Sequence, residues 1–127
     1  MVKFDERAIL DNGAYIYAMR QEIEAIADAV CEKGFDNILF TASGGSLAMM
    51  QPFDYMISVM SGLDVRSQVS AELLGVGNNR LTDRTLVFMA SKSGDTKETV
   101  EAAGYVKEKG AAIISVLGVE GSPLGGL

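Results

Sequence analysis

Apolar residues in the first quarter of the chain recur at alternating intervals of three and four positions. This spacing places them on one stripe of an amphipathic helix. The members of the stripe are Ile16, Met19, Ile23, Ile26 and Val30. Gly34 follows in the place where a left-handed residue usually ends a helix, so we expect the helix to stop at Lys33.

Further along, short apolar runs that do not alternate with polar residues predict strands covered on both faces. The clearest runs are residues 36–41 and 85–90. Residues 112–117 form a third candidate strand, and residues 64–69 are a weaker one.

Helical spacing returns between these runs, in residues 46–61, 71–75 and 96–109. Pro52 lies inside the first of these segments, where we expect a kink or an early helical turn. Strands that alternate with helices through short connections predict a parallel sheet with helices on both faces. The pattern therefore predicts an α/β sandwich in a single domain that covers residues 1–127.

The C-terminal residues predict a further helix. In Ser122-Pro123-Leu124, serine stands as a helix N-cap and proline at the first helical position. The sequence stops three residues later, whereas a doubly wound domain would continue into that helix and an edge strand. We therefore expect the domain to be truncated at its C-terminus.

Composition and charge exclude several classes of function. The chain has 17 acidic and 11 basic residues, a net charge of −6, which provides no basic surface for nucleic acid or an anionic membrane. Histidine is absent, which excludes histidine-dependent triads, metal sites and general bases from this chain. No carboxylate or cysteine cluster has metal-ligand spacing, so we expect neither a metal nor a cofactor.

The single cysteine and the hydropathy of the chain bear on its compartment. Cys31 excludes an intrachain disulfide and fits a reducing compartment, and we expect a buried thiol on a helix. No stretch approaches the roughly 20 apolar residues that span a bilayer. Residues 1–7 are charged and lack the apolar core of a signal peptide. These features together predict a cytoplasmic protein.

Two loops rich in glycine and hydroxyl groups follow the two clearest strands. The first is residues 42–46, Ala-Ser-Gly-Gly-Ser, and the second is residues 91–96, Ser-Lys-Ser-Gly-Asp-Thr. In open parallel sheets ligands bind at this edge, near the point where the strand order reverses. Glycines let the backbone approach a ligand, helix-start amides attract anions, and hydroxyl groups donate to phosphate oxygens. The pattern therefore indicates a phosphate site, to which Lys92 could add a positive charge.

Helix capping is the competing explanation for the same residues. Serine and threonine are common N-caps, and glycine is common in strand-to-helix turns. Lys92 could be an ordinary solvent-facing lysine, and Asp95 could simply favour the positive end of a helix. Two such loops after two separate strands favour the phosphate site over capping alone. A P-loop run is absent, and Gly75-Val76-Gly77 lacks the third glycine of a dinucleotide fingerprint.

Residues 91–96 resemble the Ser-x-Ser-Gly-Glu/Asp-Thr motif of sugar isomerase (SIS) domains. Residues 42–46 are similar to the earlier Gly-x-Ser loop of that family, and Gly121-Ser122-Pro123-Leu124 is similar to its later Ser-Pro-Leu turn. Within the family, the chain looks most like the N-terminal SIS half of fructosamine-6-phosphate deglycases. These are relatives of the isomerase part of glucosamine-6-phosphate synthase. The resemblance implies a three-layer α/β/α fold with a parallel, flavodoxin-like sheet, two tandem SIS domains in the parent chain, and homo-oligomers.

The resemblance also implies which residues contact a phosphorylated sugar. The hydroxyl groups that grip the sugar phosphate in the family match Ser46, Ser91, Ser93 and Thr96. Further loop and backbone contacts match Ser43, Gly44, Gly45, Lys92 and Gly94. Ser43 stands where relatives of the synthase often have cysteine, Gly45 where they have threonine, and Lys92 where they have glutamine. These departures argue against the synthase itself and leave the sugar open.

No catalytic residue is expected in this chain. In the family, the acid–base glutamate comes from the second SIS domain and a histidine often comes from a neighbouring subunit. We therefore expect the chain to be the phosphate-anchoring half of a fructosamine-6-phosphate deglycase or a related aldose/ketose isomerase, inactive alone.

Two other classes of protein compete with this interpretation. The first is a non-catalytic sugar-phosphate sensor of a transcription regulator. Such regulators usually carry a basic helix-turn-helix segment, whereas only one helical stretch is predicted before the first strand. The second is a receiver-like domain, which would need clustered acidic residues after its first strand, and residues 41–46 contain none.

Overall fold

The computed structural model describes residues 6–127, and the chain divides into two compact units, Met1–Gly34 and Phe35–Leu127. Residues 1–5, which belong to the charged stretch of residues 1–7, lie outside the described residues. That residues 1–127 form a single domain stays a prediction. Within residues 6–127, no helix is both long and apolar enough to cross a membrane.

The first unit contains two helices, α1 (Glu6–Ala18) and α2 (Arg20–Lys33). The predicted apolar stripe therefore crosses a break at Met19, whose amide bonds to the carbonyls of both Tyr15 and Ile16. Gly34 ends α2 with a φ of 73°, as the sequence predicts. Cys31 is exposed on α2, so the expectation of a buried thiol is wrong.

The second unit is built on a parallel sheet of four strands. They are β1 (Asn37–Ala42), β2 (Asp64–Val69), β3 (Thr85–Ser91) and β4 (Ala112–Leu117), in the order β2-β1-β3-β4. The connecting helices are α3 (Gly45–Met60), α4 (Ser70–Val76) and α5 (Lys97–Glu108), and a short 3-10 helix, η1, covers Pro123–Gly126. This is the beginning of the flavodoxin-like order, so the predicted fold class is confirmed.

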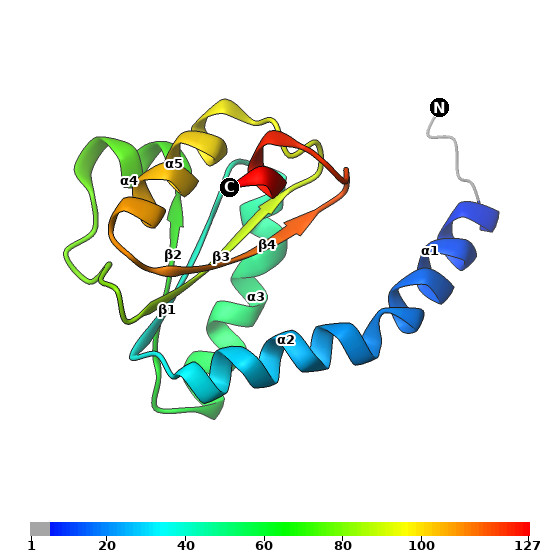
Figure 1. Cartoon of the computed structure of the whole chain (residues 1–127), viewed down its shortest axis with the longest axis horizontal. Helices are drawn as coiled ribbons and strands as arrows, with labels where there is room; N and C mark the ends of the chain where they lie inside the picture. The colour runs from blue at the N-terminus through cyan, green and yellow to red at the C-terminus, as the bar shows by residue number, and fades with distance from the viewer. Residues whose placement is uncertain (1–5) are drawn as a thin grey trace. The chain divides into compact units, whose positions relative to one another are not determined.

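The helices lie in two layers on opposite faces of this sheet (Figure 1). On one face, Leu39, Val87 and Met89 form the main core with α4, α5 and η1, and every member of that cluster is at most 9% exposed. The other face is covered by α3. On that face Phe40 of β1 and Phe88 of β3 stack, with ring centroids 5.2 Å apart. Residues alternate between the two faces along each strand, as the pleat requires.

The strand order reverses between β1 and β3, which are neighbours in the middle of the sheet. β1 leads into α3 on one face, and β3 leads into α5 on the other face. Ala42 and Ala90 are partners in register near the carboxyl ends of these strands. The two loops that the sequence singles out therefore leave the sheet at its topological switch point, where α/β proteins bind ligands.

Candidate functional site

The first predicted loop contacts the start of the helix that follows the second one. Ser43 follows β1, and its Oγ lies 3.3 Å from Oγ1 of Thr99, in the first turn of α5. Thr99 is buried, with 1% of its surface exposed, so this contact joins the β1–α3 loop to the first turn of α5. This contact and the pairing of β1 with β3 place the two predicted loops at the same edge of the sheet.

The helices that follow the loops are not capped by side chains. Gly44 is the N-cap of α3, with φ 55° and ψ −130°, and Thr96 is the N-cap of α5. Neither helix start has a side-chain cap hydrogen bond. Capping therefore does not account for the hydroxyl groups of these loops, and the first-turn amides lack side-chain acceptors.

The four predicted phosphate-gripping hydroxyl groups fall into two pairs. Ser91 is buried, its Oγ accepts a hydrogen bond of 2.9 Å from the amide of Gly94, and it lies 3.3 Å from Oγ1 of Thr96. Ser46 is half-buried and Ser93 is exposed, and neither hydroxyl has a hydrogen-bond partner among residues 6–127. Ser91 and Thr96 thus shape the second loop from within, while Ser46 and Ser93 are free to bind a ligand.

The backbone of the second loop presents a row of unpaired amides. Gly94 donates to Ser91, but the amides of Lys92, Ser93, Asp95 and Thr96 donate to no group within the described part of the chain. Successive free amides in a turn form a concave anion site of the kind found in phosphate-binding loops. Of the two predicted backbone contacts, the Lys92 amide is therefore free to donate to a ligand, whereas the Gly94 amide already donates to Ser91.

Few charged side chains lie at this edge of the sheet. Lys92 and Asp95 are both exposed and bring opposite charges. Residues 6–127 hold no group of three or more acidic, cysteine or histidine side chains that could bind a metal ion. The pKa of Arg84 is raised by its hydrogen bond to Asp36, but both residues precede strands and so lie at the opposite edge of the sheet. Anion binding here would depend on amides and hydroxyl groups.

Sequence reasoning missed two buried hydroxyl contacts at this edge. Thr99 lies one helical turn after Thr96, so helix periodicity could have placed it beneath the loop. Thr41 and Ser70, each 0% exposed, share a hydrogen bond of 3.3 Å between their hydroxyl groups. No local pattern predicts that pair, because its members are brought together only by the pairing of β1 with β2.

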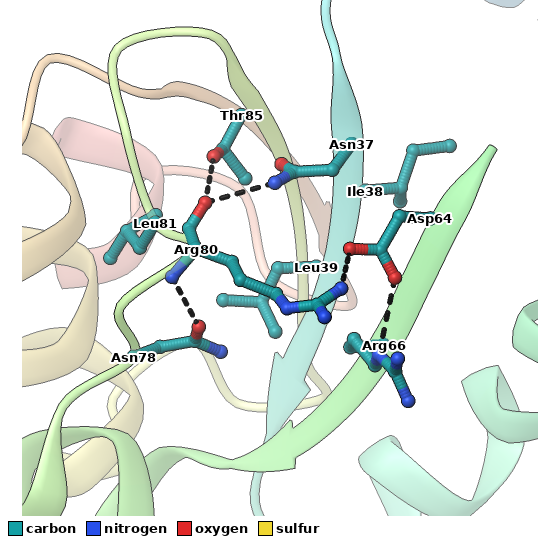
Figure 2. A pocket seen from close by; sticks show the side chains of 9 residues that line it. All are labelled: Asn37, Ile38, Leu39, Asp64, Arg66, Asn78, Arg80, Leu81 and Thr85. Carbon is teal, nitrogen blue, oxygen red and sulfur yellow. Dashed lines mark hydrogen bonds and ion pairs between the residues drawn. The ribbon is translucent and has the colours of Figure 1, made fainter.

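A second polar cluster lies around Asp64, on the opposite side of the fold from the loops. Arg66 and Arg80 both bind Asp64, and the carbonyl of Arg80 accepts bonds from Asn37 and Thr85 (Figure 2). The cavity enclosed there is only ≈ 10 Å³, about the space of one water molecule. This pocket is too small for a sugar.

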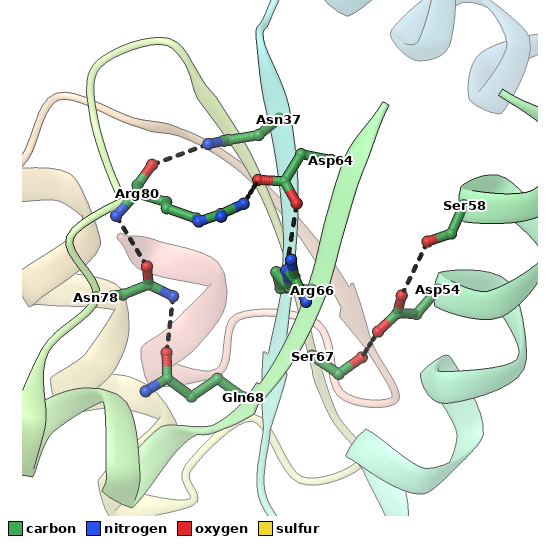
Figure 3. A network of polar contacts seen from close by, with 9 residues as sticks. All are labelled: Asn37, Asp54, Ser58, Asp64, Arg66, Ser67, Gln68, Asn78 and Arg80. Atoms are coloured by element: carbon green, nitrogen blue, oxygen red, sulfur yellow. Dashed lines mark hydrogen bonds and ion pairs between the residues drawn. The ribbon is translucent and has the colours of Figure 1, made fainter. Parts of the chain in front are cut away.

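The same cluster continues along β2 as a network of polar contacts, in which the buried Oδ1 of Asn37 has no hydrogen-bond partner within residues 6–127. Asn78 accepts a bond from the Arg80 amide and donates to Gln68, while Ser67 donates to Asp54 on α3 over 2.7 Å (Figure 3). Asp64 has two cationic partners, Arg66 and Arg80. We therefore assign this network to the stability of the β2 edge.

Comparison with known proteins agrees with the two loops. The family model of the SIS domain matches residues 34–127. The fructosamine deglycase FrlB of Bacillus subtilis is 34% identical over 107 residues, covering 84% of this chain and 33% of that protein. A glutamine–fructose-6-phosphate aminotransferase (isomerizing) of Methanococcus maripaludis is 35% identical over 118 residues, covering 93% of this chain and 18% of that protein.

Solved structures give the same result. A protein of Salmonella typhimurium LT2 assigned as a phosphosugar isomerase is 32% identical, with a TM-score of 0.73, over 80% of this chain and 30% of that one. A Bacillus subtilis protein with the same assignment is 34% identical, with a TM-score of 0.69, over 72% and 28%. The chain thus spans about a third or less of these relatives. From the fold, the two switch-point loops and these matches, the chain belongs to the SIS domain family.

Proposed function

We propose that this chain binds the phosphate group of a phosphorylated sugar, or of a sugar–amine adduct, in the two switch-point loops. The ligand would contact the hydroxyl groups of Ser46 and Ser93 and the free amides of Lys92, Ser93 and Asp95. Ser91 and Thr96 would support the loop, and their hydroxyl groups would also donate hydrogen bonds to the phosphate. Ser43, Gly44, Gly45 and Gly94 would supply the close backbone approach.

The observation that carries this proposal is the combination of two uncapped helix starts with free hydroxyl groups at one switch point. A phosphate oxygen can accept two or more hydrogen bonds, so it could satisfy donors from both loops at once. The positive ends of two helix dipoles at the same edge would add to the attraction for an anion. Relatives named for fructosamine deglycation and for fructose-6-phosphate amination support a sugar phosphate over other phosphates.

The chemistry of the parent protein follows from this anchor. We propose that the chain is the phosphate-anchoring part of a fructosamine-6-phosphate deglycase or a related aldose/ketose isomerase. Phosphate binding would position the sugar so that an acid–base residue outside this chain can act on C1 and C2. A sensor of a transcription regulator would bind the same ligand without turnover. Release of an amine from a fructosamine 6-phosphate by the parent protein would distinguish the enzyme from the sensor.

Self-association and a cytoplasmic location belong to the same proposal. On α3, Met49, Phe53, Met56 and Met60 are spaced four, three and four residues apart and are each at least 50% exposed. Such a stripe on one helix face is typical of a surface that another chain covers. Neither nucleic acid nor a membrane is proposed as a partner, given the net charge of −6.

The proposal is tested by following backbone amide resonances while fructose 6-phosphate is added. We expect the shifts to be largest at Gly45, Lys92, Ser93 and Asp95. The amides of Asn78, in the second polar cluster, and of its neighbour Asn79 serve as the internal control. Shifts centred on the control residues would place the ligand elsewhere and contradict the assignment of the site.

A further inference from the structure

The segment that follows β4 packs against the backbone of the second loop. The Leu124 amide donates to the Gly94 carbonyl over 2.9 Å, and the Gly118 amide donates to the Ser91 carbonyl over 3.4 Å. Gly118 also lies so close to the Lys92 carbonyl that a Cβ on it would be 2.5 Å from that oxygen. Three carbonyls of the loop therefore face residues 118–124.

The direction of these carbonyls fixes the direction of the free amides. In a trans peptide the C=O of one residue and the N–H of the next point to opposite sides. Since the carbonyls of Ser91, Lys92 and Gly94 face residues 118–124, the amides that follow each of them point away from that segment. These amides belong to Lys92, Ser93 and Asp95, and they are among those without a partner in the described chain.

Ser122 is the residue of this segment that packs against the turn of the second loop. Ser122 is 6% exposed, and its Oγ is buried without a hydrogen-bond partner in the described part of the chain. Ser122 is the N-cap of η1 with Pro123 at its start, as the sequence predicts, but its side chain makes no cap bond there. A buried hydroxyl without a partner is costly, which calls for another reason for its position.

That reason is found at Gly94. Gly94 is buried and has a φ of +71°, and a Cβ on it would lie 2.0 Å from Oγ and 2.4 Å from Cβ of Ser122. The side chain of Ser122 therefore occupies the space in which a side chain on Gly94 would lie. The Gly94 amide donates to Ser91.

We propose that Ser122 is a positioning residue for the phosphate site, which holds Gly94 in its left-handed conformation and so aims the amides of Lys92, Ser93 and Asp95 at the ligand. Ser122 does not touch the phosphate itself. This inference rests on the proposed phosphate site, and it adds the contact that sets the geometry of its donors.

The test is a rescue experiment with Gly94→Ala, Ser122→Gly and the double variant. Gly94→Ala places a methyl group against Ser122, so we expect its affinity for fructose 6-phosphate to fall about 30-fold or more. Ser122→Gly removes both clashing atoms, so the double variant should recover at least about 10-fold of that loss. Ser122→Gly alone should weaken binding about 3- to 10-fold, because Gly94 gains freedom. Glu120→Gly, an exposed position in the same connection, should neither weaken binding nor rescue Gly94→Ala.

A second readout does not need the ligand. Hydrogen exchange of the Gly94 amide should be about tenfold faster in Ser122→Gly than in Glu120→Gly, because the bond to Ser91 is no longer held in place. If Gly94→Ala unfolds, recovery of the melting temperature in the double variant reports the same contact.

The outcomes separate this inference from the proposed function. Rescue of binding, together with faster exchange in Ser122→Gly, would support the positioning role. A folded Gly94→Ala variant that binds as wild type, or a double variant without rescue, would overturn it. If the wild type binds no phosphorylated sugar, the proposed function fails, and Gly94 exchange then decides the positioning contact alone. Unchanged exchange in Ser122→Gly would reject it.

Discussion

Ser43 and Thr99 meet at 3.3 Å between their hydroxyl oxygens, Ser43 from the loop after β1 and Thr99 from the first turn of α5. Their separation in sequence is 56 residues, so only the pairing of β1 with β3 brings them together. This contact holds the start of α3 close to the start of α5. Two donor-rich helix starts therefore lie at the same edge of the sheet.

Loss of this bridge should affect binding more than stability. Thr99→Val keeps the shape of the buried side chain but removes the hydroxyl group that Ser43 contacts. We expect affinity for fructose 6-phosphate to fall about 2- to 10-fold, as one ordinary hydrogen bond implies. Calorimetric titration beside a thermal melt checks this. Affinity equal to wild type would show that the bridge does not set the site.

Ser93→Ala should remove a direct phosphate donor. The Ser93 hydroxyl is exposed and unpaired within residues 6–127, so its loss should leave stability unchanged. A hydrogen bond to a charged group is worth enough to lower affinity about 10-fold or more. Ser58→Ala is the control at an exposed serine near the far end of α3, where the hydroxyl donates to Asp54. Equal affinities for the two variants would remove Ser93 from the site.

Lys92 should contribute little at physiological ionic strength. Its side chain is exposed, and exposed ion pairs are weak and screened by salt. We expect Lys92→Gln to lower affinity about 2- to 5-fold at low salt and by less at 0.5 M salt. Titrations at the two salt concentrations measure this. A loss above about 30-fold at both would mean that the lysine, and not the amides, anchors the anion.

The buried pair below the site makes a prediction about stability. Thr41→Val leaves the Ser70 hydroxyl buried without its partner, which should lower the free energy of unfolding by about 1–3 kcal/mol. The double variant with Ser70→Ala removes both hydroxyl groups, so it should lose less than the two single variants added together. Denaturant unfolding of the three variants measures this. Strict additivity would indicate that the pair is not coupled.

The exposed stripe of α3 predicts self-association. Light scattering at tens of micromolar should report a dimer or a larger species, and Phe53→Lys with Met56→Lys should reduce its size. A monodisperse wild-type monomer at that concentration would count against the homo-oligomer.

Local patterns in the sequence predicted the strands, the helices that follow them and the two loops. Residues 112–117 and 64–69 match β4 and β2, because apolar runs and short connections depend on neighbouring residues. The break at Met19 was missed, since a stripe with helical spacing carries no signal for an interruption in the backbone. The unpaired Oγ of Ser122 was also missed. The position of Ser122 depends on Gly94, which lies 28 positions earlier in the sequence. The two residues meet only because the segment after β4 packs against the second loop.

The central claim, that the two loops bind a phosphate carried by a sugar, is tested most directly by calorimetric titration. Fructose 6-phosphate, glucosamine 6-phosphate and a fructosamine 6-phosphate would each be compared with unphosphorylated fructose. The account predicts saturable binding of the phosphorylated compounds and none of fructose. Fructose binding as tightly as its phosphate, or no binding of any phosphorylated compound, would contradict it.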